Sequence, residues 1–255
     1  MMLSELILDL KADSPNFGYY QSSNLQGVLM TWIDSNDAQT LHRQQRHPYS
    51  QCLLRENERW RWHIRTTNQK ANEQIIQPIL SRNISEFELT GKPMTISVLG
   101  RAYREIPQEK LLAHFYQRDY SRYLNLVFQS ATAFKQNGRY QIFPDVRLIF
   151  QSLMQKYSAS SDTVEMADEK TLEQLCRESE IVKYRLRSVK FPMEGMVIPA
   201  FMGTVAIKVK GASAMAKYAR MLAEFGEFSG IGVKSAMGMG AMRLIEERQR
   251  RHESL

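Results

Sequence analysis

Cysteine is scarce in this chain of 255 residues, which contains only Cys52 and Cys176. Two distant cysteines form neither a disulfide framework nor a zinc site, so a reducing environment is the default. Long apolar runs are missing too, since no stretch approaches the ~20 residues needed to cross a bilayer. The first residues, MMLSELILDLKAD, include Glu5 and Asp9 and do not resemble a secretory signal. We therefore expect a soluble, cytoplasmic protein without a membrane partner.

Acidic residues are fewer than basic ones, at 27 against 34, which gives a formal net charge of +7. This excess suits a polyanionic partner such as nucleic acid, although many other soluble proteins carry as much. Hydrophobic residues form 43% of the chain, enough for one large domain or two small ones that share an interface. The five histidines show no convincing metal spacing. We expect neither a metal nor another cofactor.

Hydrophobic periodicity predicts alternating strands and helices. Strands are expected over 3–11, 60–65, 84–106 (with a turn at 91–93), 123–128, 181–189, 198–209 and 241–245. Helices are expected over 25–33, 38–45, 72–80, 111–116, 145–157, 169–178 and 213–228. The order predicts an α+β fold of two tandem ferredoxin-like (RRM-like) domains, each an antiparallel sheet with helices on one face. The domains are expected to span 1–120 and 121–255.

A glycine-rich segment near the carboxyl end is the densest motif. It contains Gly230, Gly232, Lys234, Ser235, Gly238 and Gly240. Glycines let backbone N–H groups approach a phosphate closely, while a lysine adds charge and a serine adds a hydroxyl. The segment lacks the G-x-x-x-x-G-K-[ST] spacing of a Walker motif. It is not a dinucleotide fingerprint either, because its glycines follow a predicted helix and precede a strand. The alternative is a tight helix-to-strand turn that needs positive φ.

Four motifs occur in a fixed order along the chain. The first is Leu41-His42 together with the nearby Pro48-Tyr-Ser50, the second runs from Phe143 to Tyr157, and the third from Pro199 to Gly203. The fourth is the glycine-rich segment with the Ala-Met-Arg-Leu that follows it. In these motifs the chain resembles the CRISPR repeat-processing endoribonucleases of the RAMP superfamily, especially those of type III-A systems. The resemblance implies metal-independent cleavage of CRISPR precursor RNA within its repeats. It also implies 2′,3′-cyclic phosphate and 5′-hydroxyl ends.

Metal-free RNA cleavage needs a base for the 2′-hydroxyl, an acid for the leaving 5′-oxygen and a cation for the phosphate. Histidine suits either proton transfer, and Arg46 or a protonated His47 suits the charge. A histidine at a polar helix end can equally be a cap or a solvated side chain. The resemblance gives the catalytic role to His42. We therefore take His42, Arg46 and His47 as candidate catalytic residues.

This sequence departs from its apparent relatives at two points. Some of them carry a tyrosine on the first helix, where this chain has Met30, and a lysine after the histidine, where it has Arg46 and His47. These departures keep a second function open, that of a non-catalytic crRNA-binding scaffold subunit. A small-molecule phosphate-binding enzyme is a third reading with little support.

Basic residues of the second half offer an RNA surface. Lys183 and Arg185 would share one face of a strand with Arg187, and Arg139 lies nearby in sequence. A solvated strand face is the alternative. The candidate RNA-binding residues are Arg139, Lys183 and Arg185 together with Gly230, Gly232, Lys234, Ser235, Gly238 and Gly240.

Other side chains are given no functional role. Tyr184 could stack on RNA bases, but packing in the core is expected for it. His63 is expected at a surface or half-buried strand position. His114 and His252 receive no role either. Beyond the repeat RNA, the resemblance allows a homodimer and a transient association with a type III effector complex.

Overall fold

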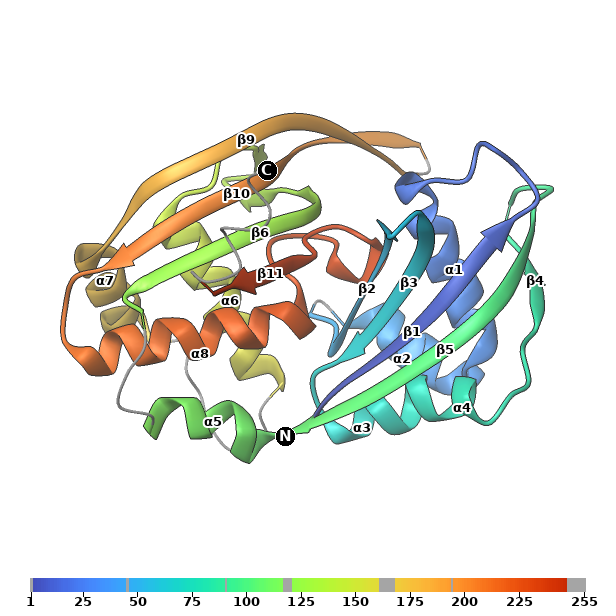
Figure 1. Cartoon of the computed structure of the whole chain (residues 1–255), viewed down its shortest axis with the longest axis horizontal. Helices are drawn as coiled ribbons and strands as arrows, with labels where there is room; N and C mark the ends of the chain where they lie inside the picture. The colour runs from blue at the N-terminus through green and yellow to red at the C-terminus, as the bar shows by residue number, and fades with distance from the viewer. Residues whose placement is uncertain are drawn as a thin grey trace.

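The computed structural model describes residues 2–44, 46–89, 91–116, 121–160, 168–193 and 195–246, with only the backbone at 108, 114 and 115. They form two large antiparallel sheets, each with helices packed on one side (Figure 1). Within these residues no helix is long and apolar enough to cross a membrane.

The first sheet has the strand order β2-β3-β1-β5-β4. Its elements are β1 (Met2–Ala12), α1 (Ser22–Trp32), α2 (Ser35–Arg43), β2 (Tyr49–Glu56), β3 (Arg59–Thr66), α3 (Gln69–Ala71), a π-helical turn (Asn72–Ile76), α4 (Gln77–Leu80), β4 (Glu86–Glu88) and β5 (Thr95–Pro107). The three helical pieces from α3 to α4 run on from one another, so they take the place of one helix.

The second sheet has the strand order β11-β6-β10-β9. The remaining elements are α5 (Gln108–Tyr116), β6 (Tyr123–Thr132), β7 (Phe134–Gln136), β8 (Arg139–Gln141), α6 (Val146–Ser160), α7 (Glu169–Glu178), β9 (Ser179–Met193), β10 (Met196–Val209), α8 (Ser213–Ser229) and β11 (Met242–Ile245). The short hairpin β7–β8 forms a separate ribbon.

Both sheets have the arrangement of a ferredoxin-like domain. Each is built from a β-α-β-β-α-β succession in which the first and third strands are central and the second and fourth flank them. The predicted fold class is confirmed. The predicted boundary at residue 120 lies within 117–120, outside the described residues, and stays a prediction.

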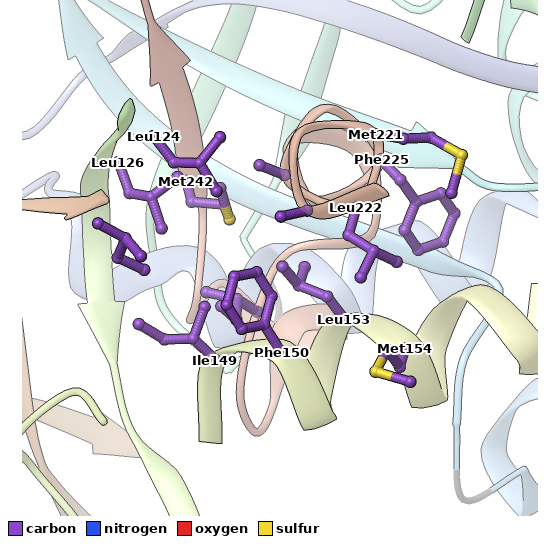
Figure 2. Packing of buried hydrophobic residues seen from close by; sticks show 14 of the residues in the cluster. Leu124, Leu126, Ile149, Phe150, Leu153, Met154, Met221, Leu222, Phe225 and Met242 are labelled. Carbon is purple, nitrogen blue, oxygen red and sulfur yellow. The ribbon is translucent and has the colours of Figure 1, made fainter. Parts of the chain in front are cut away.

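Successive side chains along the central strands point to opposite faces of each sheet. In β1, Leu6, Leu8 and Leu10 pack on the helix side, while Glu5 and Asp9 point to the other side. The second core forms in the same way. Figure 2 shows Phe150 and Leu153 of α6 directed toward Leu222 and Phe225 of α8, next to Met242 of β11.

The helix-free face of the first sheet packs against the second half of the chain. On this face the Ser50 hydroxyl donates to the carbonyl of Phe228 at 2.6 Å. On the helix side of β2, where Gln51 pairs with Ile64, the Gln51 amide donates to the carbonyl of Ala236 at 3.1 Å. The Arg104 guanidinium lies 5.3 Å from the centre of the Phe228 ring. These contacts fix α8 and the glycine-rich segment against β2 and β5.

A buried charge cluster lies on the same face of the first sheet. The Glu5 carboxylate accepts hydrogen bonds from His63 at 2.9 Å, Arg65 at 2.6 Å and Arg104 at 2.7 Å. Burial raises the pKa of Glu5, but the hydrogen bond from His63 and the charges of Arg65, His63 and Arg104 outweigh it and hold that pKa well below its usual range.

Three expectations about individual segments were wrong. His63 is buried, because it faces the second half of the chain rather than solvent. Tyr184 is 59% exposed on the edge strand β9 instead of lying in the core. The first half also contains β2, which the predicted order omitted, since a run buried on both faces shows no alternation.

Candidate active site

A cleft of about 580 Å³ lies where the end of α2, helix α6 and the glycine-rich segment meet. Its lining residues are Gln26, His42, Gln44, Arg46, His47, Tyr49, Ser152, Gln155, Lys156, Gly232, Val233, Lys234, Ser235, Ala236 and Met237. None of these described lining residues is a carboxylate, whereas three are lysine or arginine and two are histidine. The cleft therefore suits an anion.

Helix α2 delivers the predicted catalytic segment to the cleft. The Asp34 carboxylate caps its start by accepting from the backbone N–H groups of Asn36 at 2.8 Å and Asp37 at 3.4 Å. His42 occupies the last turn and is exposed. Just beyond the helix, the Arg46 guanidinium donates to the side-chain oxygen of Gln155 on α6 at 3.2 Å. The side chains of His42, Arg46 and His47 all line the cleft.

His47 is the more buried of the two histidines. Burial lowers its pKa, and the nearby charges of Lys156, His42 and Lys234 lower it further against a hydrogen bond to the Leu41 backbone. Its Nδ1 atom is buried without a hydrogen-bond partner among the described residues. The neutral ring is thus the dominant form at pH 7, so the suggested cationic role does not fit His47 in the free protein.

The glycine-rich segment contributes Gly232, Lys234 and Ser235 to the same cleft. Gly232 has a φ of 70°, and a Cβ there would lie only 2.3 Å from the carbonyl oxygen of Ala133. Lys234 is exposed. These three predicted residues lie together with His42 although almost 200 positions separate them in the sequence.

The other predicted glycines do not line the cleft. Gly230, Gly238 and Gly240 are buried, so they shape the segment and offer no surface to a ligand. At Gly238 φ is 105°, and a Cβ would lie 2.1 Å from that of Ser22 on α1. The turn interpretation of the motif is therefore correct for these positions, and it coexists with a cleft-lining role for the middle of the segment.

Lys156 on α6 is a site residue that sequence reasoning missed. Its Nζ donates to the carbonyl of Ser229 at 2.9 Å and to the hydroxyl of Ser235 at 2.7 Å. Burial lowers its pKa to about 7. A lysine on the polar side of an amphipathic helix is usually solvated, and for that reason Lys156 was given no role. The sequence singled out the motif from Phe143 to Tyr157 that contains it, but not this residue.

The structure shows what stands in place of the first-helix tyrosine that this chain lacks. Met30 packs against the first core and does not line the cleft, where α1 presents Gln26 instead. A tyrosine is present after all, because Tyr49 of β2 lines the cleft. Burial raises the pKa of Tyr49, while a hydrogen bond with Gln26 acts in the opposite direction.

Arg139, Lys183 and Arg185 are all exposed, but the structure does not bring them into the cleft. Lys183 and Arg185 do share one face of β9, as predicted, because they pair with Ala206 and Thr204 at alternate positions of β10. Among the described residues, no group of three His, Cys, Asp or Glu side chains is placed to hold a metal ion.

Comparison with known proteins gives the chain its family. A family model named CRISPR-associated endoribonuclease Cas6 matches residues 126–242. The CRISPR-associated endoribonuclease Cas6 of Streptococcus thermophilus is 37% identical over 222 residues, which are 87% of this chain and 90% of that protein. The one of Mycobacterium tuberculosis H37Rv is 36% identical over 246 residues, 95% of this chain and 78% of that protein.

Solved structures share the fold over almost the whole chain. A Cas6 product complex has a TM-score of 0.79 at 19% identity and covers 96% of this chain and 100% of its own. A Thermus thermophilus Cas6 has a TM-score of 0.75 at 21% identity, with 96% and 98% covered. The fold of this chain, with its two ferredoxin-like sheets, is that of these Cas6 structures. By its sequence relatives, this chain belongs to the Cas6 family of CRISPR-associated endoribonucleases.

Proposed function

We propose that this chain cleaves CRISPR precursor RNA within its repeats at the cleft between α2, α6 and the glycine-rich segment. The observation that carries the proposal is the convergence of His42, Arg46 and Lys234 on one cleft whose described lining contains no carboxylate. Such a surface binds the RNA backbone by charge. It also provides the side chains for proton transfer.

The proposed reaction uses the 2′-hydroxyl of the RNA as its nucleophile and no metal ion. A base removes the proton of that hydroxyl, and the oxygen attacks the adjacent phosphorus in line while the bond to the 5′-oxygen breaks. An acid then protonates the departing oxygen. The products are a 2′,3′-cyclic phosphate on the upstream fragment and a 5′-hydroxyl on the downstream one.

His42 is the proposed proton-transfer residue, because it is exposed in the cleft on a capped helix. Arg46 is the proposed cation for the non-bridging oxygens, and its bond to Gln155 fixes the guanidinium across the cleft. The neutral ring of His47 is suited to accept or relay a proton, and its unpartnered Nδ1 leaves an atom for that purpose.

The family supports an enzyme over the scaffold alternative, since both relatives described above are named endoribonucleases. The same Cas6 has been solved as a product complex and as a substrate mimic complex, which supports binding of repeat RNA by this chain. A homodimer and an association with a type III effector complex stay predictions.

A second RNA contact is proposed along β9, where Lys183 and Arg185 are exposed on one face. Alternate lysine and arginine side chains on a strand can follow successive phosphates. Tyr184 on the opposite face makes an edge-to-face contact with Phe143, with ring centres 5.5 Å apart. Exposed aromatic rings of this kind stack on unpaired bases.

The test compares His42→Ala with Arg43→Ala, an exposed neighbour on α2 that does not line the cleft. Cleavage of a labelled repeat RNA should fall at least about 100-fold in His42→Ala, because a positioned acid or base contributes that much. Binding of the same RNA should stay within a few-fold, and Arg43→Ala should cleave at a rate close to that of the wild type. Full cleavage by His42→Ala would remove His42 from the mechanism.

A further inference from the structure

The hydrogen bonds of Lys156 fit a neutral amine. Its Nζ has two acceptors, the carbonyl of Ser229 and the hydroxyl of Ser235, and no third partner among the described residues. A neutral amine has two N–H donors, whereas an ammonium has three. Protonation of Lys156 therefore adds one donor for which the surrounding protein offers no acceptor.

The charges around Lys156 are also unfavourable to an ammonium. The titratable groups of the cleft are His42, Arg46, His47, Tyr49 and Lys234, and none of these supplies a negative charge near neutral pH. The neighbouring helix α8 does carry acidic residues. They are Glu224, which binds Arg220, and Glu227, which accepts from the backbone of Leu244, and both line a separate cavity of about 410 Å³ beside α5.

A bound anion would favour the charged form of Lys156 over the neutral one. Burial without a carboxylate disfavours the charged form of a lysine, and this is the cause that lowers the pKa of Lys156 to about 7. A phosphate oxygen in the cleft would accept the third hydrogen bond and supply the opposite charge. The proton would then be held firmly, and it would come from solvent as the anion binds.

We infer that Lys156 binds a phosphate group of the RNA in the cleft and takes up a proton from solvent when the RNA binds. The inference rests on the proposed function in one respect, since it takes RNA as the anion. It assigns to α6 a phosphate contact that makes affinity for RNA depend on pH. Above neutral pH, binding must include the cost of protonating this amine.

The experiment measures proton uptake on binding by calorimetry in buffers of different ionisation enthalpy. The probe is a synthetic repeat RNA with 2′-methoxy riboses, which cannot attack the phosphorus. With the pKa of Lys156 at about 7 in the free protein, the wild type should take up about half a proton at pH 7 and close to one proton at pH 8.5, where an ordinary histidine is neutral.

Three variants separate Lys156 from its neighbours. Lys156→Met should lose about one proton of uptake at pH 8.5. Lys156→Arg should bind the RNA without that uptake, because a guanidinium is charged in both states. Lys234→Met is the matched control from the same cleft. It should bind more weakly because one cation of the cleft is lost, and the uptake should be unchanged because Lys156 is still present.

The outcomes distinguish this inference from the proposed function. Equal uptake at pH 8.5 by the wild type, Lys156→Met and Lys156→Arg would overturn the role of Lys156, even if cleavage still requires His42. Binding with the predicted uptake but no cleavage of unmodified RNA by the wild type would overturn the proposed nuclease site alone. Failure of the wild type to bind the RNA would overturn both.

Discussion

Replacing Lys156 with methionine should change how the free energy of unfolding depends on pH. Methionine has a similar length and no charge. The pKa of Lys156 is lowered by burial to about 7, whereas an unfolded lysine has a pKa of about 10.4. Between these values the unfolded chain binds more protons than the folded one, so stability rises with pH. In the wild type this contribution of Lys156 to the free energy of unfolding is complete only above about pH 10.4. It is progressively lost as the pH falls to about 7.

The size of the effect follows from the same two pKa values. Going from pH 7 to pH 9, the lysine should add about 2 kcal/mol to the unfolding free energy of the wild type, and nothing comparable in Lys156→Met. Urea unfolding of both proteins at pH 7, 8 and 9 measures this difference, and contributions from other groups largely cancel between them. If the unfolding free energies of the two proteins changed with pH in parallel, the argument that Lys156 is desolvated without a counter-charge would be refuted.

Three further predictions address the fold and the RNA surface. Glu5→Gln should lower the unfolding free energy at pH 7 by about 3 kcal/mol, because it leaves the buried Arg65 guanidinium without its carboxylate, and an unchanged urea midpoint would contradict this. Gly238→Ala should lower the melting temperature more than Gly195→Ala. Both glycines have positive φ, but only the first meets other atoms within 4 Å, so equal shifts would count against the packing argument. Lys183→Ala and Arg185→Ala should each reduce the slope of log affinity against log salt by about 1, and an unchanged slope would place the RNA elsewhere.

The elements with a clear period were predictable from sequence, and the exceptions have a common cause. Helices α6, α7 and α8 begin and end within a few residues of their predicted bounds, because each is amphipathic against a single core. Strand β2 is buried along six of its eight residues, since both of its faces are covered. Its sequence consequently has no alternation, and local patterns cannot show that a second domain will cover a face.

The same limit applies to the candidate site. His42 and the glycine-rich segment were identified from local motifs, yet their meeting in one cleft depends on how the two sheets pack. Lys156 was missed because a lysine on a polar helix face is normally solvated, and only the packing of α6 near Ser229 and Ser235 desolvates it. His63 was placed wrongly for the corresponding reason, since its strand face is covered by the other half of the chain.

Cleavage of a labelled repeat RNA in excess EDTA tests the central claim most directly. The wild type should cut the RNA once per repeat without added metal and leave a 5′-hydroxyl on the downstream fragment. A single 2′-deoxy sugar at the cut position should abolish that cut, because the nucleophile is missing. Loss of cleavage in EDTA, or cleavage of the deoxy substrate at the same bond, would contradict attack by the 2′-hydroxyl at a metal-independent site.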